Sequence, residues 1–152
     1  AALFHDVARQ KERENGIPHE ETGAQMAERY LRSIQYDEER IRKITHAIRT
    51  HRYRSTAKPK TREARILSDA DKLDAMGAIG IARTFIRAGE HGGDITDAME
   101  HIHDKLLNLS GLMYTGTAKK IAEERHRFLC AFMETLTDEM DLSGCSSGDL
   151  PR

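Results

Sequence analysis

Apolar residues recur at intervals of three and four along most of this 152-residue chain. That spacing places them on one face of an α-helix, whereas a half-buried strand requires alternation at every second position. No segment sustains such alternation, and valine, a residue typical of strands, occurs only once, as Val7. The pattern predicts an all-α fold, arranged as a single-domain helical bundle.

Turn and capping residues divide this pattern into helices. The expected N-caps are Asp37, Thr61 and Asp94. We expect a long helix after Thr61 that Gly77 and Gly80 interrupt, letting another backbone approach closely, and that Gly89 ends. The last long helix is expected to begin at Thr117 and to end near Met140. The prediction is one domain over residues 1–142, followed by a flexible tail over 143–152.

Composition excludes several classes of protein. The formal net charge is -1 although 32% of residues are charged, which argues against nucleic-acid binding through a basic surface. No apolar run approaches the roughly 18 residues that a membrane span needs. The two cysteines, Cys130 and Cys145, lack metal-ligand spacing. A reducing, cytoplasmic setting is therefore predicted, with a disulfide between them only weakly supported.

The chain opens with Ala1, Ala2, Leu3 and Phe4, without a methionine or a basic signal segment. We therefore expect it to begin inside a helix.

Histidine and aspartate residues form a spaced series along the first half of the chain. The series comprises the adjacent pair His5 and Asp6, then His19, His51 and Asp71. Each has an ordinary alternative, such as a chance His-Asp pair or an exposed histidine at a helix start. Asp71 is different, because it lies among apolar residues of a predicted helix and so needs a partner there, such as a metal ion. Imidazole and carboxylate together suit divalent metals of the first transition row.

This ordered set resembles the signature of the HD-domain superfamily: a histidine, a His-Asp pair, further histidines, and an aspartate in an apolar helix. The run from Ala64 to Met76 is particularly similar to the final-aspartate motif. By motif the resemblance covers residues 1–88, and segments around His101 and His126 resemble the C-terminal part of small stand-alone HD phosphohydrolases. No Gly-Tyr-Pro follows His51, which departs from the branch that cleaves cyclic dinucleotides.

The resemblance implies a divalent metal ion (Mn, Mg, Zn, Fe, Ni or Co) held by His5, Asp6 and Asp71. The family's first ligand histidine lies one helix upstream of the His-Asp pair. We therefore expect that the sequence lacks this helix, the alternative being an impaired metal site. A bound metal would activate water and polarise a phosphoryl oxygen. This implies hydrolysis of a phosphoester of a nucleotide or other small phosphorylated metabolite, with a catalytically degenerate metal- or nucleotide-binding regulatory domain as the alternative.

Roles for the remaining site candidates follow from their positions beside these ligands. We expect Asp71, Asp6 and His51 to be catalytic, and the substrate to be contacted by His19, Arg9, Lys72 and Arg52. Whether His19 and His51 bind a second metal ion is left open, with substrate contact or a weak second site favoured. His46 is expected to be a supporting or core residue, and His101, His103 and His126 to be packing or surface residues.

A basic segment supports an anionic substrate. Between residues 40 and 65 there are ten lysines and arginines against Glu63 alone: Arg40, Arg42, Lys43, Arg49, Arg52, Arg54, Lys58, Lys60, Arg62 and Arg65. The alternatives are a solvated helix face or a nucleic-acid surface, the latter disfavoured by the near-neutral total charge and the 5% aromatic content. Exposed apolar residues on the last helix would permit a homodimer.

Overall fold

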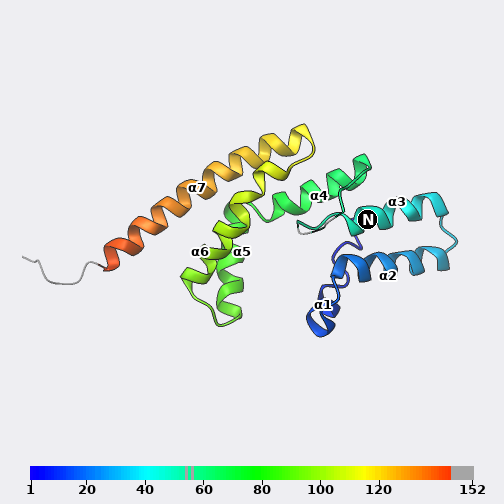
Figure 1. Ribbon diagram of the computed structural model, residues 1–152, viewed down its shortest axis with the longest axis horizontal. Coiled ribbons are helices and arrows are strands. Elements are labelled where there is room, and N and C mark those ends of the chain that lie inside the picture. The colour runs from blue at the N-terminus through cyan, green and yellow to red at the C-terminus, as the bar shows by residue number, and fades with distance from the viewer. Residues whose placement is uncertain (54, 56, 145–152) are drawn as a thin grey trace, which may run out of the picture.

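The computed structural model describes residues 1–53, 55 and 57–144, with side chains up to residue 141. These residues form seven α-helices and no strand, which confirms the all-α prediction (Figure 1). The helices are α1 Arg9–Asn15, α2 His19–Ser33, α3 Glu38–Arg49, α4 Arg62–Asp74, α5 Gly77–Glu90, α6 Ile95–Asp104 and α7 Gly116–Gly144. Two short 3-10 helices, Leu106–Asn108 and Ser110–Leu112, precede α7. No helix in this part of the chain is long and apolar enough to cross a membrane.

The prediction that the chain begins inside a helix is wrong. Residues 2–8 form consecutive turns, and α1 starts only at Arg9. The backbone bonds here close tight turns, as in Phe4 N–H to Ala1 O at 2.9 Å. The carbonyl of Ala2, which would accept from Asp6 N–H in an α-helix, lies 2.7 Å from His5 Nδ1 instead. The hydrogen bond from the His5 side chain thus occupies the carbonyl that a helical backbone hydrogen bond would use.

Local capping chemistry sets the starts of three helices as predicted. The Asp37 carboxylate accepts from Arg40 N–H at 2.8 Å, and the Thr61 hydroxyl accepts from Ala64 N–H at 3.1 Å. Asp94 forms a reciprocal capping box with Asp97 at the start of α6. These bonds satisfy backbone donors that a helix leaves unpaired.

The long helix predicted after Thr61 is interrupted as expected, between α4 and α5. Gly77 adopts a φ of 75°, a conformation that favours glycine. A Cβ on Gly80 would lie 2.1 Å from the carbonyl oxygen of Ala75, so the closely approaching backbone is that of the α4–α5 connection itself. Gly89 does not end α5, because the helix continues to Glu90 and the left-handed residue beyond it is Gly92.

The described residues contain two separate apolar clusters. The larger one joins α5, α6 and α7 through Ile81, Ile102 and Leu129, among others. The smaller one comprises Ala24, Ala27 and Ile48, where α2 and α3 pack as an antiparallel pair (Figure 1). Helix α4 contacts both α3 and α7 and so connects the two halves.

The last helix extends to Gly144, beyond the predicted end near Met140. Residues 143 and 144 of the predicted tail therefore belong to α7, whereas residues 145–152 lie outside the described residues. The division into a domain and a tail stays a prediction.

Candidate metal centre

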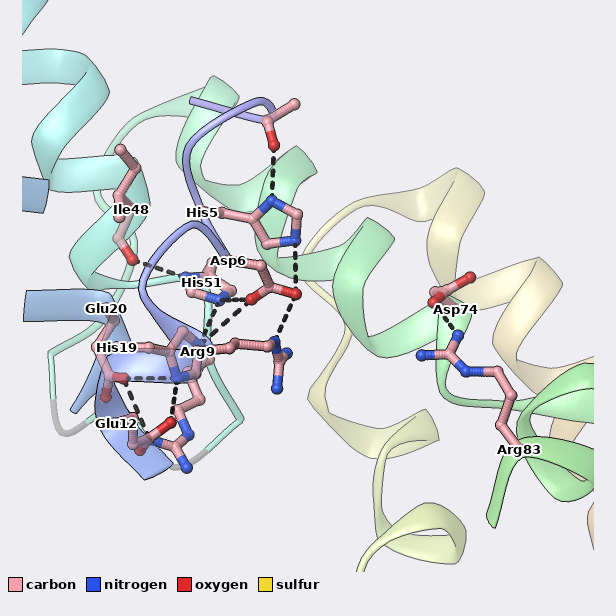
Figure 2. Close-up of polar contacts among 12 residues, drawn as sticks. His5, Asp6, Arg9, Glu12, His19, Glu20, Ile48, His51, Asp74 and Arg83 are labelled. Carbon is pink, nitrogen blue, oxygen red and sulfur yellow. Dashed lines mark hydrogen bonds and ion pairs between the residues drawn. The ribbon is translucent and has the colours of Figure 1, made fainter. Parts of the chain in front are cut away.

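Four segments bring the predicted histidines and aspartates together. His5 and Asp6 come from the N-terminal turns, His19 is the first residue of α2, His51 follows α3, and Asp71 lies in α4. The ligand atoms of His5, His51 and Asp71 lie within 4.8 Å of one another, and so do those of Asp6, His19 and His51. The structure therefore gathers all five residues, with His51 common to both sets. Figure 2 shows four of them, His5, Asp6, His19 and His51.

The three imidazole rings are oriented by acceptors at Nδ1. These contacts are His5 to Ala2 O at 2.7 Å, His51 to Ile48 O at 2.6 Å and His19 to Glu12 Oε2 at 2.6 Å. Each acceptor requires a proton on Nδ1, which leaves the Nε2 lone pair of a neutral ring available. Such an arrangement is typical of metal-binding histidines.

The Nε2 atoms of His19 and His51 converge on Asp6. They lie 3.4 Å and 3.7 Å from Asp6 Oδ1 and 3.4 Å from each other. Tetrahedral bonds of about 2.1 Å separate neighbouring ligand atoms by about 3.4 Å, so this spacing fits an ion between them. Asp6 Oδ1 is buried and has no hydrogen-bond partner. A buried carboxylate oxygen facing two nitrogen lone pairs requires a cation or a proton.

The second oxygen of Asp6 faces the other side of the cluster. Oδ2 accepts from Arg9 Nε at 2.6 Å and lies 3.5 Å from His5 Nε2. Asp6 therefore lies between two groups of side chains: His19 and His51 face its Oδ1, and His5 and Arg9 face its Oδ2.

The electrostatics of the cluster favour a negative Asp6. Burial alone would raise the pKa of Asp6, but the contacts with His19, His51 and Arg9 outweigh burial and hold it far below its usual value of 3.8. Asp6 in turn raises the pKa of His19 above 6.5, with Glu12 adding to this effect and burial opposing it. Asp6 therefore favours the protonated form of His19.

Glu12 and Glu20 form a carboxylate pair that the sequence analysis missed as site residues. Arg52 Nη1 donates to Glu12 Oε1 at 2.7 Å and to Glu20 Oε2 at 3.1 Å. Glu20 stands next to His19 in the sequence, which is a weak signal. No local signal connects Glu12 with Arg52, because 40 positions separate them.

Lys72 is a further candidate residue, and it is connected to the cluster through Ser68. Lys72 is 5% exposed, and its ammonium donates to the Ser68 carbonyl at 3.0 Å and hydroxyl at 2.5 Å. The Ser68 hydroxyl donates to His51 O at 3.0 Å, so Lys72 reaches the site through Ser68. Burial lowers the pKa of Lys72. Its role as a substrate ligand stays a prediction.

The other histidines and charged residues have local partners. His46 Nε2 accepts from Lys60 N–H at 2.9 Å, which ties the loop to α3. His126 contacts Cys130, whereas His101 and His103 are exposed on α6. Asp74 pairs with Arg83 away from the cluster (Figure 2). Within the basic segment, Arg49 pairs with Glu21 and Lys43 with Glu39, and Arg54 lies outside the described residues.

Comparison with known proteins assigns the family. The HD domain model matches residues 1–76, the half of the chain that contains the whole cluster. This chain belongs to the HD-domain family. The uncharacterized protein YpgQ of Bacillus subtilis is 41% identical over 110 residues, which cover 67% of this chain and 53% of YpgQ. The present chain thus spans about half the length of that relative.

Solved structures share the fold. The crystal structure of YpgQ has a TM-score of 0.64 at 34% identity, covering 76% of this chain and 63% of YpgQ, and another structure shows YpgQ in complex with ADP. An HD-superfamily hydrolase from Bacillus thuringiensis has a TM-score of 0.68 at 35% identity, covering 93% of this chain and 71% of that protein. The HD-domain chain described here therefore has the fold of HD-superfamily hydrolases.

Proposed function

We propose that this chain is a metal-dependent phosphohydrolase that acts on a nucleotide or another small phosphorylated metabolite. The observation that carries the proposal is the buried Asp6 Oδ1, which has no hydrogen-bond partner and lies 3.4 Å and 3.7 Å from two imidazole nitrogens. This donor set fits a divalent cation of the first transition row.

The residues divide between the two oxygens of Asp6. His5, Asp6 and Asp71 would hold the ion, and His51 lies within reach of the same position. His19 and His51 beside Oδ1 would hold a second ion or contact the substrate. When bound, a divalent metal lowers the pKa of water and polarises a phosphoryl oxygen, the chemistry that phosphoester hydrolysis needs.

Arg9 is the cation best placed to orient an anionic substrate. Its side chain is 49% exposed, and its Nε is held by Asp6 at 2.6 Å. The remaining guanidinium donors can then bind phosphate oxygens at the exposed edge of the cluster. Lys72 would contact phosphate as well once its bonds to Ser68 are broken.

The nucleotide part of the proposal is supported by YpgQ, which was crystallised with ADP. The local excess of basic residues over 40–65 is consistent with a phosphorylated ligand. A cytoplasmic location and a homodimer stay predictions from the sequence.

The test is phosphate release from a panel of nucleotides and phosphomonoesters by metal-stripped protein reloaded with Mn, Mg, Zn, Fe, Ni or Co. We expect turnover with at least one ion and none after Asp71→Ala. Glu14→Ala is the matched control, because Glu14 is exposed on α1 and pairs only with Gln10 among the described residues. Binding of metal and ADP without any product would instead identify the regulatory alternative. Full activity of the Asp71→Ala protein would refute the site.

A further inference from the structure

The contacts of His19 carry an inference about a residue beyond the metal ligands. We propose that Glu12 is a positioning residue that holds His19 with Nε2 directed at Asp6, and that Arg52 holds Glu12 in place instead of binding substrate phosphate. The inference rests on the proposed function, because it concerns how the metal position is prepared.

Glu12 is the nearer of two carboxylates at His19 Nδ1. Its Oε2 lies 2.6 Å from Nδ1, whereas Glu20 Oε2 lies 3.6 Å away. A carboxylate only accepts hydrogen bonds, so the proton of a neutral His19 ring must be on Nδ1. The His19 side chain is completely buried, so no solvent contact competes with this bond. Glu12 therefore selects the tautomer whose Nε2 lone pair faces Asp6 and His51.

Arg52 contacts both carboxylates, through the second oxygen of Glu12 and through the Glu20 oxygen that faces His19. Its Nη1 donates to Glu12 Oε1 at 2.7 Å and to Glu20 Oε2 at 3.1 Å. Both oxygens of Glu12 thus have partners, one on His19 and one on Arg52, which leaves the carboxylate a single orientation. The same bond ties residue 52, just after His51, to α1. Its bond to Glu20 also connects the segment after His51 to α2, which begins with His19.

The bonds of Arg52 also account for the presence of Glu20 as a second carboxylate near His19. The ligand atoms of Glu12, His19 and Glu20 lie within 4.8 Å of one another, close enough to consider a separate metal site. The guanidinium of Arg52 already supplies positive charge to both carboxylates, and His19 Nδ1 presents a proton there. These three residues are therefore assigned to support the metal position rather than to bind an ion of their own.

The first test reads the His19 tautomer directly in metal-free protein. Imidazole ¹⁵N chemical shifts of ¹⁵N-histidine-labelled protein at a pH where His19 is neutral should report a proton on Nδ1 in the unmodified chain. We expect mixed tautomers for Glu12→Ala and retention of the original one for Glu12→Gln, whose amide oxygen still accepts from Nδ1. Glu14→Ala, on the exposed side of α1, should leave the spectrum unchanged.

The second test measures Zn²⁺ and Mn²⁺ affinity by calorimetric titration. Loss of a partner that orients a histidine ligand typically costs about 10- to 100-fold in metal affinity, which is the expectation for Glu12→Ala. Glu12→Gln should recover most of this loss. Arg52→Lys should remain close to the unmodified protein, whereas Arg52→Met should lose affinity and show mixed His19 tautomers.

Several outcomes would overturn the inference. An unchanged tautomer and affinity in folded Glu12→Ala protein would remove the role of Glu12. A raised KM for Arg52→Met with unchanged metal affinity and tautomer would assign Arg52 to the substrate. If Glu12→Ala fails to fold, Glu12→Gln decides, since a changed tautomer there contradicts the inference. Absence of metal binding by the unmodified chain would refute the proposed function, while the tautomer comparison would still decide the role of Glu12.

Discussion

Asp6 concentrates the chemistry of the site in one side chain. Its Oδ1 faces His19 and His51, and its Oδ2 faces His5 and Arg9. A carboxylate can serve both sides because each oxygen has two lone pairs, whereas an amide would present hydrogen donors to one of them.

Asp6→Asn should therefore reduce metal affinity by at least about 100-fold, more than the usual loss on removing a supporting partner. Metal content after dialysis and calorimetric titration would measure the loss. Asp74→Asn is the control, because Asp74 is exposed and paired with Arg83 outside the cluster. Equal affinity of the Asp6→Asn and unmodified proteins would exclude Asp6 as a ligand.

The charge on His19 gives the metal-free protein a defined pH dependence. The pKa of His19 is raised above 6.5 in the folded state, chiefly by Asp6. Between 6.5 and that raised pKa the folded state binds more protons than the unfolded state, so the free energy of unfolding should increase as pH falls through this window. The gain is fully present below 6.5 and lost as pH rises through the folded pKa.

Urea denaturation of chelator-treated protein from pH 6 to 9 would measure this effect. In Asp6→Asn the increase should largely disappear, because the main cause of the raised pKa is gone. Protein loaded with metal should behave oppositely, since protons compete with the ion for His19. Identical slopes in the unmodified and Asp6→Asn metal-free proteins would contradict the pairing of these residues.

At the scale of elements, close packing of the N-terminal turns on α2 positions the His-Asp pair. A Cβ on Gly23 would lie 3.2 Å from the Phe4 carbonyl oxygen and 3.6 Å from that of His5. Glycine is needed here for close approach, since the residue lies within α2 and does not have a positive φ.

Gly23→Ala should displace the segment that carries His5 and lower metal affinity, although alanine is the better helix former. Gly89→Ala is the matched control, because nothing lies within 4 Å of its added Cβ in α5. The control should gain about 0.5–1 kcal/mol of stability and keep its metal affinity. Metal titration and thermal unfolding of both variants would test this, and equal behaviour would argue against close packing at Gly23.

Two of the aspartates of helix α4, Asp69 and Asp71, have different tasks. Asp69 is 2% exposed and accepts from the backbone N–H groups of Tyr114 and Thr115, each at 2.8 Å, so it fastens α4 to the segment just before α7. Asp71, two positions later, belongs to the candidate metal centre.

Substitution of these aspartates should separate stability from metal binding. Asp69→Ala leaves two backbone donors without their acceptor and should cost about 2–4 kcal/mol of unfolding free energy while the metal centre is retained. Asp71→Ala should abolish bound metal with helicity largely intact. Denaturant titration, circular dichroism and metal analysis distinguish the two, and loss of metal in a fully stable Asp69→Ala protein would reverse the assignment.

At the scale of the whole molecule, the candidate centre lies in the half with the smaller apolar cluster. Among the described residues its buried members are Ala24, Ala27 and Ile48, with Phe4 and Ile44 packed against them, whereas the α5–α7 half contains a larger cluster. Ligands from the N-terminal turns, α2, the end of α3 and α4 would let a bound ion connect the N-terminal turns and α4 to the packed α2–α3 pair.

Metal removal should consequently loosen one half of the molecule more than the other. An ion at 100 times its Kd stabilises the folded state by about 2.7 kcal/mol. We expect a chelator to increase amide hydrogen exchange in α1, α2 and α3 and to leave exchange in α5 and α6 nearly unchanged. A uniform increase along the chain would show that the ion does not act locally.

The sequence by itself determined what depends on local interactions. Helical periodicity gave the all-α fold, and the capping side chains of Asp37, Thr61 and Asp94 act within three residues of themselves. The order of His5, Asp6, His19, His51 and Asp71 was sufficient to indicate the family because the motif is a property of the chain. These features require no knowledge of how the helices pack.

Tertiary structure alone decided which charged residues meet. Arg52, predicted to bind substrate, pairs with Glu12 and Glu20, and Lys72, given the same role, is enclosed against Ser68. The turns over residues 2–8 likewise replaced the helix expected at the start of the chain. Long charged side chains form hydrogen bonds with the partners that packing brings within about 3 Å. Burial strengthens these bonds, because the dielectric constant of the interior is lower than that of water. Sequence spacing cannot anticipate a contact between residues 40 positions apart.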